Sequence, residues 1–390
     1  MKRILHTGAM ALILIPILCL FSYCEDKGKG TASGIESTRL NEAALLFAGK
    51  EIPAGSALSD FASSPFYKSY RAQMESGWNR FQKPNLEKIA AWWKSHRPAR
   101  GSSNVLYPFS GPDIMNALTF FPDADTYIMF GLEQPGAIPN PHAMTADEIR
   151  RGLNGLKNSL GDILHLNFFK TEGMAAELSS SSFNSILGVI MYFLATNGYT
   201  VIDARRIAID DSGEVVPGLP SDERIRWQNP PRSRVPGVEI VFRKGEGKRQ
   251  TARYFMLNVI DQALKQYSPN FVPYLMKNGP YDTVIKSASY LMHNDREKFT
   301  KIRAAILAAT NFLVQDDSGI PLRYFTPAEW KLAFHGYYDR PIPLFASRYQ
   351  PDLKKAMRER STGTLPFSYG YDYLPGQSNL MTAERIKSTR

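Results

Sequence analysis

Apolar residues along the chain follow two periods, and each period predicts a different element. Spacings of three and four residues predict helices, while short alternating or continuous apolar runs predict strands. The helices expected on this basis are 38–47, 64–78, 85–96, 114–121, 145–157, 161–169, 183–196, 283–292 and 296–314, with a further helix start at 326–329. The expected strands are 105–107, 126–132, 199–209, 238–243, 251–259 and 321–325.

These elements predict an α+β fold. Residues 238–243 and 251–259 are joined by the glycine-bearing segment KGEGKR, which is typical of a hairpin. Phe183–Thr196 is apolar on all sides, so it is expected to be the most deeply buried helix. We therefore expect a mixed, largely antiparallel sheet of about five strands packed against several helices.

The N-terminus has the pattern of an export signal. MKR gives a positive start, and Gly8–Phe21 is an apolar run shorter than the ~20 residues of a spanning helix. Cys24 follows, as in a bacterial lipoprotein whose cysteine becomes the lipidated first residue, although the bulky Tyr23 precedes it. Cleavage further along the chain and an uncleaved anchor remain alternatives. We expect export, a lipid anchor on Cys24, and a place in the cell envelope on the periplasmic or surface side.

These signals divide the chain into four parts. Residues 1–23 are expected to be a signal peptide, and 24–40 the lipidated cysteine and a flexible polar tether. Residues 41–373 are expected to form a single globular domain, because their apolar pattern is continuous. Residues 374–390 are expected to be a loose C-terminal tail.

Composition and charge limit the classes of protein that this chain can belong to. The chain has 390 residues, of which 43% are hydrophobic and 22% charged, an ordinary globular balance. Its formal charge is +10, but the Lys and Arg residues are spread along the sequence, so we expect no nucleic-acid partner. Removal of the signal would take Cys19 with it and leave Cys24 alone, so no disulfide is expected.

The densest cluster of turn residues is YPFSGPD, Tyr107–Asp113. Its prolines and glycine predict a rigid turn, and its aromatic residues are expected to anchor that turn to the core. Asp113 is expected to cap the helix that follows it. A functional rim at this turn is the alternative.

Several motifs together resemble a family of uncharacterised exported bacterial proteins. They are YPFSGPD, FFPDADTYIMFGLE, SASYLMH and QDDSGIPLRYF, and the similarity covers most of residues 65–373. The resemblance implies one compact module and an exported location. It supplies no catalytic residues, because no activity is established for that family.

Catalytic and metal-binding patterns are sparse. The six histidines form no HExxH or HxH pair, and the turns at 210–214 and 315–319 lack the spacing of a calcium-binding loop. A G-x-S-x-G turn is absent. We therefore expect no metal and no cofactor.

Carboxylates at the ends of predicted elements are the remaining catalytic candidates. They are Asp113, Glu133, Asp316 and Asp317, with Arg323 expected to pair with one of the last two. Partial burial beside apolar runs would raise their pKa values and suit them to proton transfer. The competing interpretation is that they cap helices and hold turns.

Two hypotheses of function follow. The first, which we favour, is a non-enzymatic envelope lipoprotein that binds an unknown ligand or protein partner, or acts structurally. The second is an exported hydrolase that uses paired carboxylates on a glycan or another envelope polymer. The two differ in whether the carboxylates converge in a cleft or are held by local hydrogen bonds.

Overall fold

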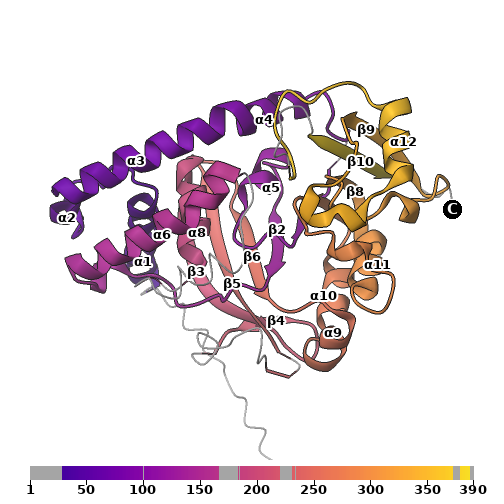
Figure 1. Cartoon of the computed structure of the whole chain (residues 1–390). Helices are drawn as coiled ribbons and strands as arrows, with labels where there is room; N and C mark the ends of the chain where they lie inside the picture. The colour runs from indigo at the N-terminus through magenta and orange to yellow at the C-terminus, as the bar shows by residue number, and fades with distance from the viewer. Residues whose placement is uncertain are drawn as a thin grey trace, which may run out of the picture.

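The protein is built around one ten-stranded sheet (Figure 1). The computed structural model describes residues 29–99, 101–166, 183, 185–219, 231–232, 234–371 and 378–386. The strands lie in the order β4-β3-β5-β6-β2-β1-β7-β8-β10-β9. Their bounds are β1 Asn104–Pro108, β2 Thr126–Gly131, β3 Tyr199–Ile209, β4 Val215–Pro217, β5 Val235–Lys244, β6 Gln250–Met256, β7 Tyr281–Ile285, β8 Thr310–Gln315, β9 Trp330–Gly336 and β10 Asn379–Arg385.

The five central strands, β6-β2-β1-β7-β8, are parallel to one another. The outer strands are joined to them by antiparallel pairs, with β5 on β6 at one side and β10 on β8 at the other. The chain leaves β1 for β2 on one side and returns later to β7 on the other side. The strand order therefore reverses at β1, between β2 and β7.

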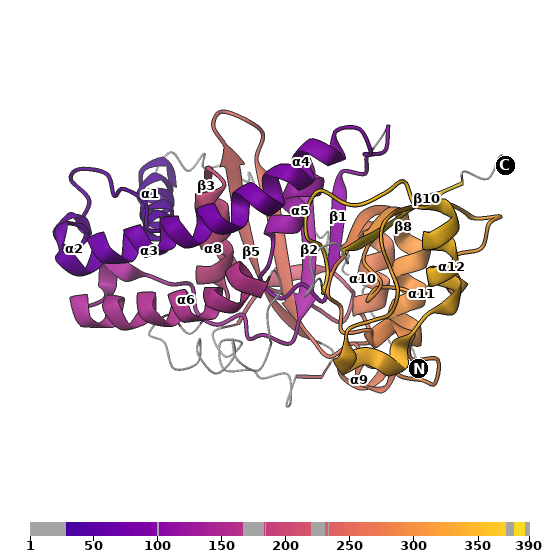
Figure 2. The same ribbon diagram turned by 45° about the horizontal axis from the view of Figure 1, so that its top comes forward.

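Helices cover both faces of the sheet (Figures 1 and 2). The α-helices are α1 Lys29–Phe47, α2 Ser59–Ser63, α3 Pro65–Phe81, α4 Glu87–Trp93, α5 Met115–Phe120, α6 Ala146–Leu166, α8 Leu187–Thr196, α9 Asp261–Tyr267, α10 Phe271–Asn278, α11 Thr300–Ala309 and α12 Pro351–Arg360. Gln82–Leu86 is a π turn between α3 and α4, and short 3₁₀ turns lie at Pro141–Ala143, Leu291–His293, Leu322–Tyr324 and Pro343–Arg348.

Successive side chains of the parallel strands point alternately to the two faces of the sheet, which explains why helices pack on both faces. Val105 and Tyr107 of β1 point to the face covered by α1, α3–α6 and α8, whereas Leu106 points to the face covered by α9–α12. All three side chains are buried. A parallel strand buried on both faces has few polar positions, which is why its sequence is a short apolar run.

The predicted α+β class, with a mixed sheet packed against several helices, is confirmed, but the number of strands is wrong. The sheet has ten strands rather than about five. The central strands are parallel, and antiparallel pairing is confined to the two outer parts. Within the described residues, no helix is both long enough and apolar enough to cross a membrane.

The predicted start of a helix at Thr145 is confirmed, because a pair of capping hydrogen bonds marks it. Thr145 N–H donates to Glu148 Oε2 at 2.8 Å and Glu148 N–H donates to Thr145 Oγ1 at 3.3 Å, the reciprocal pair of a capping box. The helix that they start is α6, which runs unbroken to Leu166 where two helices were expected. Gly161, where the second helix was expected to begin, lies inside α6.

Most of the other wrong expectations lie in the half of the sheet that β7, β8, β9 and β10 form. Residues 283–292 and 296–314 were expected to be helices, but β7 occupies the start of the first and β8 the end of the second. The expected strand 321–325 instead contains the 3₁₀ turn Leu322–Tyr324, and 326–329 form a turn that leads into β9 rather than a helix. Burial of β7 and β8 on both faces removed the alternation that identifies a strand.

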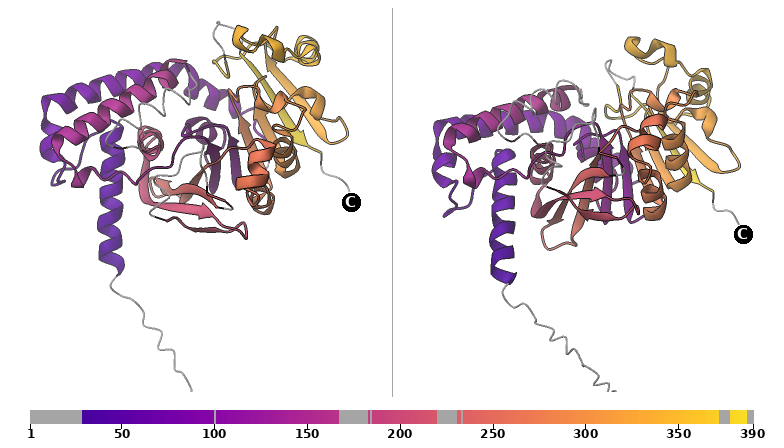
Figure 3. Two further views of the ribbon diagram at one scale, coloured as in Figure 1. Left: turned by 60° about the horizontal axis from the view of Figure 1, so that its bottom comes forward. Right: turned by 90° about the horizontal axis from the view of Figure 1, so that it is seen from below.

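Both ends of the described chain are more regular than expected. The tether was expected to extend from residue 24 to residue 40, but α1 begins at Lys29, and its first turns extend beyond the rest of the molecule (Figure 3). The loose tail expected at 374–390 contains β10, which lies between β8 and β9 with Leu380 and Ala383 buried. Cys24 and the expected signal peptide lie outside the described residues.

Candidate functional site

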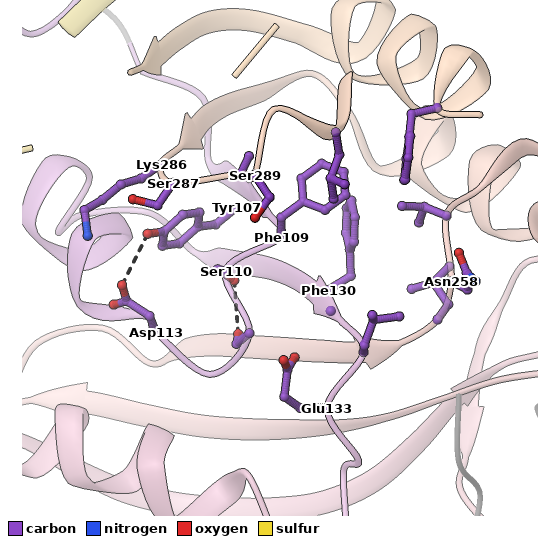
Figure 4. Close-up of a pocket in the computed structure, with 18 of the residues that line it drawn as sticks. Tyr107, Phe109, Ser110, Asp113, Phe130, Glu133, Asn258, Lys286, Ser287 and Ser289 are labelled. Atoms are coloured by element: carbon purple, nitrogen blue, oxygen red, sulfur yellow. Dashed lines mark hydrogen bonds between the residues drawn. The ribbon is translucent and has the colours of Figure 1, made fainter. Parts of the chain in front are cut away.

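A pocket of about 320 Å³ lies beyond the carboxyl ends of β1, β2, β6 and β7, where the strand order reverses (Figure 4). In open sheets with parallel strands, this crevice is the usual place for a ligand. We call it the switch-point pocket. Its lining residues, grouped by the strand that they end or follow, are Tyr107, Phe109, Ser110, Gly111 and Asp113; Phe130, Gly131, Leu132 and Glu133; Leu257, Asn258, Val259 and Ile260; Lys286, Ser287, Ala288, Ser289 and Leu291, with Phe299 from the start of α11.

Phenylalanine rings form much of the pocket wall. The ring centroid of Phe109 lies 5.4 Å from that of Phe130 and 6.5 Å from that of Phe299, with the rings tilted steeply to one another. Leu257 and Ile260 extend this apolar surface. Walls of this kind bind the flat apolar part of a small molecule, and a few polar groups then fix its orientation.

The turn between β1 and α5 is held by its own hydrogen bonds. Phe109 and Gly111 have φ values of 60° and 51°, in the left-handed region that a sharp turn uses. Asp113 Oδ1 accepts from Met115 N–H at 3.2 Å, so Asp113 bonds the first amide of α5 as the predicted cap would, although Ile114 is the residue directly before the helix. Asp113 Oδ2 accepts from Asn116 Nδ2 at 3.1 Å and from the Tyr107 hydroxyl at 3.4 Å.

Asp113 therefore has two roles, because it caps α5 and also lines the pocket. Burial raises the pKa of its carboxyl group, and the nearby charge of Lys286 together with the hydrogen bonds opposes that rise. The pocket reaches a carboxyl group whose oxygens already accept three local hydrogen bonds.

Lys286 is the buried cation of this site, with 4% of its surface exposed. It follows β7 directly and lies close enough to Asp113 and Asp316 for both charges to act on it. Burial lowers the pKa of the Lys286 amine, and the two carboxylates oppose that shift. Sequence reasoning missed this residue because β7 was read as a helix. Recognised as a strand, TVIK would have placed a lysine at the carboxyl edge of the sheet.

Glu133 lies at the end of β2 and is 3% exposed. The Tyr254 hydroxyl of β6 donates to Glu133 Oε2 at 2.9 Å. Gly131 makes room for this carboxylate, because a methyl group on Gly131 would lie 2.4 Å from Glu133 Oε2. In Figure 4 the carboxylate points toward the turn that carries Ser110.

Asp316 and Asp317 do not line the pocket. Asp316 Oδ1 accepts from Ser318 Oγ at 2.6 Å, and Asp316 Oδ2 accepts from Ser287 N–H at 3.1 Å. Asp317 accepts from the Tyr290 hydroxyl and, at 3.0 Å, from Asn379 Nδ2 of β10. Burial raises the pKa of both carboxyl groups. These two residues hold the turn after β8.

Arg323 pairs with neither of these acids, which corrects the expected ion pair. Its Nη2 lies 3.0 Å from Asp295 Oδ2 and donates to the carbonyl oxygen of His293 at 3.2 Å. Asp295 is half exposed, so this pair belongs to the surface. Among the carboxylates proposed from sequence, the structure brings only Asp113 and Glu133 to the pocket.

Metal-binding side chains do not gather in the part of the chain that the structure describes, where no three His, Cys, Asp or Glu residues are placed to hold an ion. The turn at 210–214 is closed by Asp210 itself, whose Oδ1 accepts from Ser212 N–H at 2.9 Å and Glu214 N–H at 3.0 Å. Comparison of the chain with protein-family models, with curated proteins and with solved structures finds no match.

Proposed function

We propose that this chain is an exported cell-envelope protein, anchored by a lipid on Cys24, that binds a small ligand in the switch-point pocket without transforming it. The observation that carries the proposal is the pocket itself, with phenylalanine walls and buried polar groups at the point where the strand order reverses. Pockets of this position and composition are the common form of small-molecule sites.

The arrangement of the acids favours binding over hydrolysis. Asp316 and Asp317 lie outside the pocket, and their oxygens accept hydrogen bonds from neighbouring groups. Asp113 caps a helix, and Tyr254 donates to Glu133. A hydrolase with paired carboxylates would need one of these groups to give up its bonds during the reaction. The hydrolase alternative predicts hydrolysis of an envelope glycan that is lost in both Asp113→Asn and Glu133→Gln.

Ligand binding is tested by thermal unfolding of the mature chain against a panel of nucleosides, sugars, amino acids and short acyl compounds. A ligand that binds only the folded state raises Tm, by an amount that grows with its concentration. Leu291→Trp would place an indole at a half-buried position in the pocket wall and should abolish the shift. Leu344→Trp, at an exposed position outside the pocket, is the matched control and should keep it. If no panel compound raises Tm, the proposed function is wrong.

The location is tested separately with Cys24→Ala. A lipid anchor predicts that the native chain fractionates with membranes and that the variant is released into the soluble exported fraction. Retention of the variant in the membrane would contradict anchoring through Cys24.

A further inference from the structure

We infer that the ligand of the switch-point pocket is a nucleoside that carries no 5′-phosphate, with its ribose hydroxyls bonded to Glu133 and its base against the phenylalanine walls. This inference rests on the proposed function, because it names the class of ligand for the same pocket. It follows from the strand order, the place of Glu133, the apolar walls, and the hydrogen bonds of the first turn.

The strand order puts an acid where nucleotide-binding sheets use one. Counted among themselves in chain order, the parallel strands β6-β2-β1-β7-β8 have the order 3-2-1-4-5. In sheets of this order, an acidic residue about 20 residues after the glycines of the first turn accepts hydrogen bonds from ribose hydroxyls. Glu133 follows Gly111 by 22 residues, since 133 − 111 = 22, and lies just past the end of the second parallel strand.

The backbone brings that acid and the first turn close together. A methyl group on Gly131 would lie 2.4 Å from Glu133 Oε2 and 3.3 Å from the Cα atom of Gly111. The hydrogen bond from the Tyr254 hydroxyl orients the carboxylate. A carboxylate accepts up to about four hydrogen bonds, and the Tyr254 hydroxyl supplies one of them.

The remaining wall of the switch-point pocket is apolar and aromatic, which suits the flat ring of a nucleobase. Phe109, Phe130 and Phe299 meet around the pocket, and Leu257 and Ile260 come from the loop after β6. Stacking on an aromatic side chain stabilises a nucleobase by about 1–3 kcal/mol. A sugar alone would leave most of this apolar surface uncovered, which favours a ligand with both a ribose and a base.

The amides at the start of α5 are engaged in hydrogen bonds within the first turn, which disfavours a phosphate at that position. Asp113 N–H donates to the carbonyl oxygen of Ser110 at 3.1 Å, and Ile114 N–H donates to that of Pro112 at 3.0 Å. Met115 N–H donates to Asp113 Oδ1, and Pro112 has no N–H. The amides of Asp113, Ile114 and Met115 are thus engaged within the turn, so the start of α5 does not offer the free amides that hold a pyrophosphate in a dinucleotide site.

The test is isothermal titration calorimetry of the mature chain with adenosine, guanosine, cytidine and uridine. At least one should bind, and its 2′-deoxy analogue should bind at least about tenfold more weakly, because the buried carboxylate loses a charge-assisted bond. The corresponding 5′-monophosphate should also bind more weakly. Glu133→Gln should remove the preference for the ribonucleoside over the deoxynucleoside. Glu42→Gln, a buried carboxylate outside the pocket, should leave it unchanged.

The outcomes separate this inference from the proposed function. If no nucleoside binds, but another panel compound binds and is blocked by Leu291→Trp, the ligand class is wrong and the pocket function stands. If a nucleoside binds the native protein with no preference over its deoxy analogue, the role of Glu133 is wrong, whether or not Glu133→Gln folds. A 5′-monophosphate that binds more tightly than the nucleoside would overturn the exclusion of phosphate.

Discussion

Asn379 and Asp317 exchange two hydrogen bonds across 62 residues of sequence. Asp317 N–H donates to Asn379 Oδ1 at 2.7 Å, and Asn379 Nδ2 donates to Asp317 Oδ1 at 3.0 Å. Both residues are buried. The pair joins β10 to the turn after β8, next to the loop that carries Lys286.

We expect Asn379→Ala to lower the free energy of unfolding by about 2–4 kcal/mol, because a buried carboxylate and a buried amide both lose a partner. Urea unfolding measures this cost. Asn85→Ala removes a single bond, from Asn85 Nδ2 to the carbonyl oxygen of Phe81, and should cost less than about 1 kcal/mol. If the two substitutions lower the free energy of unfolding equally, the Asn379–Asp317 pair contributes no more to stability than a single local hydrogen bond.

Gly131→Ala should weaken ligand binding, because the new methyl group would displace the Glu133 carboxylate. The accompanying loss of stability should be about 1–3 kcal/mol, the usual cost of overpacking. Gly161→Ala is the control, since nothing lies within 4 Å of a methyl group there and the position is inside α6. It should raise the stability by up to about 1 kcal/mol, as alanine favours a helix over glycine. Calorimetric titration and urea unfolding measure the two effects.

Asp282 should make the protein less stable above about pH 6 than a neutral replacement would. Burial raises the pKa of its carboxyl group from 3.8 to about 6, and hydrogen bonds from Ser102 only partly oppose the rise. Between these two pH values the folded state binds more protons than the unfolded state, so this contribution to stability falls as the pH rises and is lost above about pH 6.

Asp282→Asn should therefore stabilise the fold by about 1–3 kcal/mol at pH 8, and the gain should shrink toward pH 4. Urea unfolding at a series of pH values follows the change. The control is Asp123→Asn, which removes the same charge from an exposed position and should have little effect at any pH. A gain for Asp282→Asn that does not vary with pH would contradict the burial argument.

His335 should make the protein sensitive to acid. Burial and the neighbouring His96 lower the pKa of the His335 imidazole from 6.5 to about 4. The unfolded state then binds more protons between these values, so stability is full above about pH 6.5 and falls as the pH drops toward 4. His335→Gln should reduce the fall in the free energy of unfolding between pH 6.5 and pH 4 by roughly 1–3 kcal/mol, since glutamine does not titrate. An unchanged slope between pH 6.5 and 4 would assign the acid sensitivity to another group.

The sequence was sufficient for elements with a local signal. The capping box of Thr145 and Glu148, the alternating strand β3 and the hairpin of β5 and β6 were all read correctly. In each case the residues that determine the element are neighbours in the chain. The same holds for Asp113, whose capping bond to Met115 spans two residues.

The missed elements are those whose stability comes from distant partners. β8 follows α11 without an intervening turn residue, so an apolar run from Ile302 to Val314 looked like one helix. Only pairing with β7 and β10 makes its second half a strand. Lys286 was missed for the same reason. Its position at the sheet edge depends on β7 being a strand.

The place of β10 has a consequence for the order in which the molecule can assemble. β9 ends at Gly336 and β10 begins at Asn379, so 42 residues of chain lie between them (379 − 336 − 1 = 42), yet the two strands pair. A chain that emerges from a ribosome with its N-terminus first must hold β9 without its strand partner until β10 has emerged. During that interval two strand edges, those of β8 and β9, are open to other chains. This side of the sheet is therefore complete only when the chain is present through residue 385, and a product shortened before β10 would keep the edges of β8 and β9 open to pairing with other chains.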